Sequence, residues 1–533
     1  MLSNARQPCD EAVIRADHDV EDCEESTGRW VLAAAILGSS ISFIDGTVVN
    51  VALPALQRGL GATVSETQWI VEAYSLMLSA LILVGGSLGD RLGRKRIFST
   101  GVFLFAAASI WCGVSPNITQ LIFARGVQGI GAAMLVPGSL SLISANFSKR
   151  RRGRAIGTWS GISAVAAGIG PVLGGWLVQN FSWRWIFWIN VPMCTAVLLI
   201  TWLRVPESRD GDADGPFDWP GPVLATIGLG GIVFGLVESN ARGFADTLVI
   251  ASLVVGILAF AGFLLVESRK EQPMMPLGLF RSKAFAGANL LTLFLYAGLS
   301  GLMFFLPFNL IRIQGYSPTA AGAALLPFVL TMFILSRWAG GLVDHYGSRV
   351  PLVVGPLIAA AGFALFALPG ADTGSFWTSF FPAVMVMSIG MAISVAPLTT
   401  TVMGAVDERH AGIASGINNA VSRTAGLLAV AVFGVIMVSI FSRSLDQRLN
   451  LLPIPPDIRR QIAAEHGQFV ELKIPDGLTT EGQTAVKQAV NQSFVSGFRI
   501  VTIVAATLAV LSAFFAWLLI PGKGRENPRK DRS

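Results

Sequence analysis

Cysteine and histidine are scarce in this chain of 533 residues, which contains four of each. The cysteines lie in a polar tail and in apolar runs, without the spacing of a disulfide framework or a zinc site. The sequence also lacks a His-Glu-x-x-His motif, a nucleophile elbow and a Walker A phosphate loop. We therefore expect no catalytic residues, no metal site and no cofactor, and an enzyme or sensor is only a remote alternative.

Charged residues are scarce as well. They make up 14% of the chain, whereas hydrophobic residues make up 53%, and the mean hydropathy is +0.61. Because a soluble globular domain contains about 25% charged residues, this composition predicts a polytopic membrane protein. The net charge of +6 lies mostly in short loops and the last tail, where it indicates membrane orientation rather than nucleic-acid binding.

Fourteen apolar runs dominate the sequence, and most are long enough to cross a hydrocarbon layer roughly 30 Å thick. They predict an all-α membrane protein with fourteen transmembrane helices. The runs cover residues 30–56, 67–88, 97–114, 119–145, 155–178, 185–204, 219–238, 247–267, 285–311, 319–342, 350–369, 376–403, 411–441 and 495–520.

Lysine and arginine gather in alternate loops between these runs. One cluster is the glycine-rich turn 86–96, and others follow at 149–154 and 269–283 and in the last tail, while the remaining loops hold isolated cases such as Arg184. Because basic residues concentrate on the cytoplasmic side of spanning helices, we expect both termini in the cytoplasm and the chain in the cell (inner) membrane. Residues 1–28 are acidic and have no basic start, so we expect a cytoplasmic tail and not a signal peptide.

The turn 86–96 recurs at an offset of 254 residues. Its second copy keeps matching residues at Gly340, Asp344, Gly347 and Arg349. Such a repeat is typical of transporters built from two related helix bundles. It predicts five parts: the tail 1–28, a first six-helix bundle at 29–204, a linker with two inserted helices at 205–284, a second six-helix bundle at 285–520 that includes an external hairpin at 442–494, and a basic tail at 521–533.

Charged residues inside the predicted helices are the candidates for chemistry. A charge at the centre of a spanning helix costs about 2.5–3.5 kcal/mol on insertion scales, so each needs a partner or a purpose. Asp45, Glu72 and Arg125 all lie in the first bundle, and we expect them to serve proton coupling and transport. A static ion pair with a spare acid is the alternative. Further polar residues are expected to line a substrate cavity: Asn50, Arg423, Asn418 and Asn419.

The fifth predicted helix is rich in glycine. Its glycines, Gly157 and Gly161 among them, predict close approach to neighbouring helices, and Pro171 predicts a bend. The glycine–proline segment consists of Gly170, Pro171, Gly174 and Gly175.

Several of these motifs resemble those of the major facilitator superfamily. The first turn resembles the signature turn between its helices 2 and 3, through Gly86, Asp90, Arg91, Gly93, Arg94 and Lys95. The Arg125 segment resembles the superfamily's helix 4 motif, whose arginine is implicated in proton transfer. The Gly170–Gly175 segment resembles the helix 5 motif of exporters, although Ala166 stands where glycine is usual.

The stretch from Asp45 to Pro54, the segments Trp183–Phe187 and Asn190–Pro192, and the fourteen expected helices resemble the fourteen-span drug/proton antiporter branch. The resemblance implies proton-coupled export of small amphipathic compounds by alternating access, with Asp90 and its basic neighbours latching the inner side. The proton gradient replaces a cofactor. The implied partners are a small molecule, protons and the bilayer, with no nucleic acid and no obligatory protein partner. Transport of one dedicated metabolite is the alternative.

Overall fold

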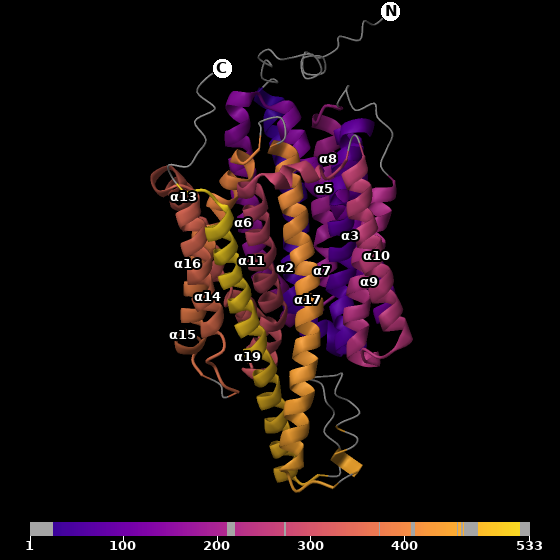
Figure 1. Cartoon of the computed structure of the whole chain (residues 1–533). Helices are drawn as coiled ribbons and strands as arrows, with labels where there is room; N and C mark the ends of the chain where they lie inside the picture. The colour runs from indigo at the N-terminus through magenta and orange to yellow at the C-terminus, as the bar shows by residue number, and fades with distance from the viewer. Residues whose placement is uncertain are drawn as a thin grey trace, which may run out of the picture. The chain divides into compact units, whose positions relative to one another are not determined.

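The computed structural model describes residues 25–209, 219–270, 273–371, 374–406, 411–455, 457–459, 462 and 478–522. The tails predicted at 1–28 and 521–533 lie largely outside these residues. Within them the chain is helical and forms no strand (Figure 1). Thirteen of the described helices are long and apolar enough to cross a membrane, and a shorter apolar helix, α14 (Arg349–Leu365), completes fourteen. The predicted all-α fold with fourteen spans is therefore confirmed.

The helices of the first half follow the predicted runs but extend past them. Their bounds are α2 Glu25–Leu60, α3 Val64–Leu92, α4 Arg94–Val114, α5 Ile118–Asn146, α6 Lys149–Asn180, α7 Trp185–Trp188 and α8 Asn190–Arg204. Pro54 lies inside α2 and does not end it. Asn117 caps the N-terminus of α5, because its side chain accepts a hydrogen bond from the backbone N–H of Gln120 at 2.9 Å.

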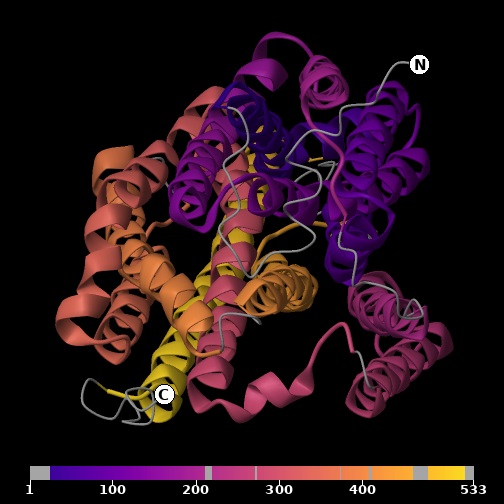
Figure 2. The same cartoon turned by 90° about the horizontal axis from the view of Figure 1, so that it is seen from above.

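The inserted pair consists of α9 (Pro220–Arg242) and α10 (Thr247–Arg269), which run side by side (Figures 1 and 2). A Cβ added to Gly231 of α9 would lie 2.7 Å from the carbonyl oxygen of Ser252, so glycine permits this close packing. The other faces of α10 expose large apolar side chains such as Val254, Ile257 and Leu258, as expected of a helix in contact with lipid.

The second half contains the remaining elements. They are η1 Leu277–Arg281, α11 Lys283–Phe308, the π-helical η2 Asn309–Ile313, α12 Pro318–Ala323, α13 Leu326–Tyr346, α14, α15 Phe376–Ser379, α16 Phe381–Gly404, α17 Ala411–Asn450 and α19 Thr480–Leu519. The repeated turn keeps its backbone form. Gly93 and Gly347, which match in the repeat, have φ of +115° and +73°, where a side chain is strained.

α17 and α19 each contain 40 residues and therefore span about 60 Å, twice the thickness of the hydrocarbon layer. Both extend well past the other helices of the second half at the lower edge of Figure 1. Leu445 and Leu449 on α17 and Val486 on α19 are buried in these extensions, and Arg448 donates to Gln492. The described part of the predicted external hairpin 442–494 thus consists mainly of two helix ends.

The chain divides into two compact units. Unit 1 comprises Met1–Ala52, Ala73–Leu229 and Leu258–Met274, and unit 2 comprises Leu53–Glu72, Gly230–Ile257 and Met275–Ser533. The end of α2 and the beginning of α3 therefore group with unit 2, although the rest of both helices belongs to unit 1.

Candidate functional site

Unit 1 contains a buried ion pair between α2 and α5. Asp45 lies in the middle third of α2 with 0% of its surface exposed, and Arg125 lies in the first third of α5 with 1% exposed. Arg125 Nη1 is 2.6 Å from Asp45 Oδ2. The structure thus brings together two of the three charged residues that the sequence singled out.

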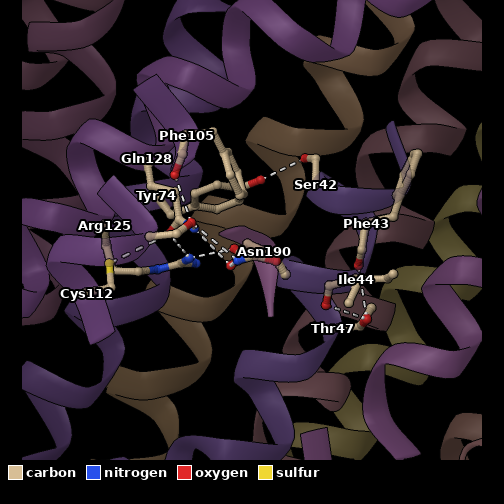
Figure 3. A network of polar contacts seen from close by, with 12 residues as sticks. Ser42, Phe43, Ile44, Thr47, Tyr74, Phe105, Cys112, Arg125, Gln128 and Asn190 are labelled. Carbon is tan, nitrogen blue, oxygen red and sulfur yellow. Dashed lines mark hydrogen bonds and ion pairs between the residues drawn. The ribbon is translucent and has the colours of Figure 1, made fainter. Parts of the chain in front are cut away.

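Two neutral amides complete the coordination of the carboxylate (Figure 3). Gln128, one turn after Arg125 on α5, accepts from Arg125 Nη1 at 2.6 Å and donates from Nε2 to Asp45 Oδ1 at 3.0 Å. Asn190 at the start of α8 donates to the same Oδ1 at 2.9 Å. Both Asp45 oxygens are therefore occupied by donors from α5 and α8.

The serine Ser109 on α4 holds the two amides in place. Its hydroxyl accepts from Gln128 Nε2 at 2.9 Å and from Asn190 Nδ2 at 3.4 Å, and it donates to the Phe105 carbonyl at 2.8 Å. All five side chains of this network are buried, with at most 1% of the surface of any of them exposed. The network therefore joins α2, α4, α5 and α8 through polar contacts that water does not reach.

An aromatic ring covers the guanidinium. The Cζ atom of Arg125 lies 4.3 Å from the ring centroid of Tyr74 on α3, a distance at which the ring face attracts a cation. The Tyr74 hydroxyl is 2.8 Å from Ser42 Oγ on α2. Tyr74 thus links the cation to the helix that carries Asp45.

Two glycines of α6 pack against α2 close to Asp45 in sequence, at Thr47 and Val48. A Cβ on Gly170 would lie 2.0 Å from Thr47 Oγ1, and one on Gly174 would lie 2.9 Å from the Val48 carbonyl oxygen. The predicted close approach of this segment is therefore present, and its partner is α2. For Gly157 and Gly161 the same expectation is wrong, because a Cβ on either would meet no atom of the described chain within 4 Å.

The two charges of the network depend on each other. Breaking a buried ion pair by removing one charge costs about 3–5 kcal/mol, because the other charge stays uncompensated. Asp45 and Arg125 are therefore each stabilised by their contact between α2 and α5.

The other expected site residues do not join this network. Glu72 is fully buried on α3, and neither of its oxygens has a hydrogen-bond partner among the described residues. Asn50 and Arg423 are half-buried, and Asn419 is exposed. Asn418 on α17 donates to Thr292 Oγ1 at 2.7 Å and to Asn289 Oδ1 at 3.2 Å, both on α11. These three asparagines and Arg423 remain predicted cavity residues.

The basic turn of unit 1 contacts an acidic residue, Glu207, which follows α8 in the chain. Arg94 Nε pairs with Asp90 Oδ1 at 2.9 Å. Glu207 accepts hydrogen bonds from the backbone N–H groups of Lys95 at 3.0 Å and Arg96 at 3.2 Å, and so caps the N-terminus of α4. A Cβ on Gly93 would lie 2.7 Å from Glu207 Oε1, a second reason for glycine there.

In the second copy of the turn, Arg349 donates to the carbonyl oxygen of Trp517 and lies over its ring at 5.5 Å. A Cβ on Gly340 would be 4.0 Å from Ala396, so this position is not tightly packed. Asp344 belongs to α13, but its side chain lies outside the described part of the chain.

Sequence reasoning missed Gln128, Asn190, Ser109 and Tyr74. Neutral polar residues are common in spanning helices, so each alone carried little signal. Two signals were present: Gln128 follows Arg125 by three residues on the same helix face, and Asn190 belongs to the Asn190–Pro192 segment.

Comparison with known proteins gives consistent results. Residues 35–430 match the family model described as Major Facilitator Superfamily. The chain is 32% identical to the tetracenomycin C resistance and export protein of Streptomyces glaucescens, over 91% of this chain and 90% of that protein. It is 32% identical to the multidrug resistance protein Stp of Mycobacterium tuberculosis, over 91% of both chains, and 35% identical to the puromycin resistance protein pur8 of Streptomyces alboniger, over 76% of this chain and 81% of that protein.

Solved structures show the same fold. A bacterial homologue of the human lysosomal transporter Spinster, crystallised in an inward-facing and unoccupied conformation, matches with a TM-score of 0.63 and 18% identity, over 92% of this chain and 98% of that one. The xylose transporter XylE from E. coli in an inward-open conformation matches with a TM-score of 0.56 and 13% identity, over 93% of this chain and 97% of that one.

Proposed function

Because the chain belongs to the major facilitator superfamily and is a multi-pass membrane transporter, we propose that it exports small amphipathic compounds in exchange for protons. The relatives named as resistance or export proteins support export of drug-like compounds. The observation that supports proton coupling is the fully buried Asp45–Arg125 pair. Protonation would remove the negative charge that holds Arg125. The energy source is the proton gradient, without a cofactor.

The exchange proceeds by alternating access of one site to the two sides of the membrane. A proton from outside neutralises Asp45, which frees Arg125 from its partner and favours a rearrangement of α2 against α5. Loss of the proton to the inside restores the 2.6 Å ion pair and its amide donors. Gly170 and Gly174 allow α6 to slide closely along α2 during this change.

The proposal also includes an orientation of the chain in the membrane. With the basic turn that contains Arg94 and Lys95 in the cytoplasm, both termini are cytoplasmic and the extensions of α17 and α19 are external. The membrane is the cell (inner) membrane, and transport requires only the small molecule, protons and the bilayer. The turn between α3 and α4, with Asp90 paired to Arg94 and Glu207 capping α4, would act as the inner latch.

Everted membrane vesicles test the proposal through pH-gradient-driven uptake of a lipophilic cationic dye. We expect wild-type protein to accumulate the dye and to release protons, and Asp45→Asn and Arg125→Ala each to lose at least about 90% of the initial rate, since each leaves a buried group unpaired. Asp246→Asn and Arg443→Ala repeat the same substitutions at solvent-accessible positions outside the network and should keep the wild-type rate.

A double variant separates proton coupling from a static ion pair. Replacing both partners of a buried pair by neutral residues of similar size is often harmless to stability. The variant Asp45→Asn with Arg125→Met should therefore insert and fold, but it should not regain gradient-driven transport. Full recovery of transport in that variant would overturn the coupling role of Asp45. If only one compound of a panel of unrelated compounds is transported, the protein is a dedicated metabolite exporter and not a multidrug exporter.

A further inference from the structure

The last spanning helix of each half ends in the same short motif. The segment Trp202–Pro206 at the end of α8 reads WLRVP, and Trp517–Pro521 at the end of α19 reads WLLIP. In both, the residue before the proline is 2% exposed, and its backbone N–H donates to the carbonyl oxygen four positions earlier. The internal repeat seen at the basic turn therefore extends to these two helix ends.

A cation from the repeated turn contacts this motif in both halves. Lys95 Nζ donates to the Trp202 carbonyl oxygen at 3.2 Å. Arg349, which matches Lys95 in the repeat, donates to the Trp517 carbonyl oxygen. Both tryptophans are exposed, Trp202 at 75% and Trp517 at 54%. Because exposed tryptophan next to a basic residue is typical of the membrane–water boundary, we expect both helix ends at the level of the lipid headgroups.

The two copies differ in one acidic residue. The position after the proline is Glu207 in the first copy and Gly522 in the second. Glu207 accepts from the backbone N–H groups of Lys95 and Arg96 and lies 3.6 Å from Arg96 Nε. Gly522 lies beside the matching cation, since a Cβ on it would be 3.8 Å from Arg349 Cδ, but it has no carboxylate. The first copy thus supplies its own anion, and the second does not.

The guanidinium of Arg349 keeps donors for an anion. It contacts Trp517 through the carbonyl oxygen and through the ring, whose centroid is 5.5 Å from Cζ. Its Nε has no hydrogen-bond partner among the described residues, and none of their carboxylates forms an ion pair with it. A guanidinium presents its N–H groups in a planar fork that matches a phosphate. The described chain therefore leaves this cation without a counter-ion.

Apolar side chains surround the Trp517 ring on α19. Phe514 and Leu518 are 48% and 55% exposed, and the Phe514 ring centroid is 6.3 Å from that of Trp517. A free phosphate gains nothing from such a surface, whereas the acyl chains of a lipid bury apolar area against it. The surface therefore favours a phospholipid over a free anion.

Further positive charge lies at this end of α19. The start of α11 packs against it, because a Cβ on Gly287 would be 2.8 Å from Leu519 Cβ. Lys283, one turn before Gly287, is exposed, and so is Arg281 on η1. A zwitterionic headgroup would bring its own ammonium toward these cations, whereas an anionic headgroup carries only the phosphate charge. Basic pockets between spanning helices on the cytoplasmic side bind headgroups of this kind.

We propose that Arg349 and Trp517 form a binding site for an anionic phospholipid at the expected cytoplasmic end of α19. The headgroup phosphate accepts hydrogen bonds from the guanidinium and takes the place that the Glu207 carboxylate has in the first copy. The acyl chains lie along Phe514 and Leu518. The site is independent of the proposed export, since it uses no residue of the Asp45–Arg125 network.

Native mass spectrometry of the purified protein in a neutral detergent tests the site. The probes are phosphatidylglycerol and phosphatidylcholine with identical acyl chains, which differ in net charge. We expect the wild-type protein to bind phosphatidylglycerol more tightly. Arg349→Gln should lower the affinity for phosphatidylglycerol by at least about fivefold, because the cation is lost, and should change the affinity for phosphatidylcholine by less than about twofold.

Two further variants use the internal repeat as a control. Gly522→Glu supplies the acidic residue of the first copy at a position with room for a Cβ, and its carboxylate should pair with Arg349 and lower the affinity for phosphatidylglycerol to a similar extent. Lys95→Gln removes the matching cation of the first copy, which already has Glu207 nearby, and should change that affinity by less than about twofold. Thermal unfolding of each variant shows whether the fold is retained.

Three results would overturn the site. Equal losses for both lipids in Arg349→Gln would show that the headgroup charge is not recognised. An unchanged affinity for phosphatidylglycerol in Arg349→Gln or in Gly522→Glu would show that the guanidinium does not bind it. A loss in Lys95→Gln as large as in Arg349→Gln would indicate general attraction to basic residues. Because lipid binding is measured without a proton gradient, failure of dye transport in vesicles would refute export and leave the lipid site standing.

Discussion

Neutral polar side chains determine whether the buried Asp45–Arg125 pair is stable inside a membrane protein. Two charges removed from water are stabilised only when further hydrogen bonds satisfy their remaining donors and acceptors. Gln128 supplies one acceptor to Arg125 at 2.6 Å and one donor to Asp45 at 3.0 Å. It therefore bridges the two charges, whereas Asn190 donates to Asp45 and to Ser109.

Replacing Gln128 by methionine should destabilise the protein. The side chain keeps its length and loses both polar atoms, so each charge loses a partner at a site without water. We expect the free energy of unfolding to fall by about 1–3 kcal/mol. Gln120→Met makes the same change at an exposed position of the same helix and should shift it by less than about 0.5 kcal/mol. Denaturation in detergent, followed by tryptophan fluorescence, measures both, and equal shifts would contradict the bridging role.

The sequence predicted the charged members of the network but not its geometry. Asp45 and Arg125 stood out because an intramembrane charge is costly and rare. Their contact depends on how α2 rotates against α5, which no local pattern specifies. Glu72 has the same signal in sequence, but neither of its carboxylate oxygens has a hydrogen-bond partner among the described residues. Its role in proton coupling stays a prediction.

Glycines, as well as polar contacts, determine how closely α6 packs against α2. On α6, Gly170 and Gly174 let the backbone approach Thr47 and Val48 of α2, on the segment that carries Asp45. The sequence predicted the fourteen helices and close packing at Gly170 and Gly174, but not that α2 is the partner helix. It did not predict that Gly161 packs against nothing within 4 Å, because which face of a helix is buried depends on its neighbours. The ends of α17 and α19 were not predicted either. Polar residues continue both helices past the predicted apolar runs, to Asn450 and from Thr480.

A methyl group at Gly170 should impair the protein, whereas one at Gly161 should not. The added Cβ of Gly170→Ala would overlap Thr47 Oγ1, and overpacking of this kind costs about 1–3 kcal/mol. Gly161→Ala adds the same group on the same helix in open space, where it favours helix formation by up to about 1 kcal/mol. Dye transport and thermal unfolding in parallel measure the two effects.

A second substitution identifies the cause of the Gly170 effect. Thr47→Ala removes the oxygen that the new methyl group would meet, so the double variant Gly170→Ala with Thr47→Ala should regain part of the lost stability and transport. A double variant as impaired as Gly170→Ala alone would show that contact with Thr47 is not the reason for glycine at this position.

At the scale of the whole molecule, the distribution of basic residues determines which end of each helix faces the cytoplasm. Each lysine or arginine disfavours translocation, so the many basic residues around Arg94, Arg152 and Lys283 act together, and isolated ones such as Arg184 are outweighed. Fourteen spans then return the chain to its starting side. From the same reasoning we expect the α9–α10 loop and the tip of the α17 extension to lie outside.

Single cysteines, introduced after the four native ones are removed, should report this orientation in intact cells. Ala245 lies in the exposed α9–α10 loop, Leu451 is 85% exposed at the end of α17, and Lys283 is exposed at the start of α11. A membrane-impermeant maleimide should label Ala245→Cys and Leu451→Cys in intact cells, and Lys283→Cys only after permeabilisation. The reverse pattern would invert the topology and place the basic turn outside. Because the proposed proton entry and compound exit both depend on this orientation, inversion would convert the predicted exporter into an importer.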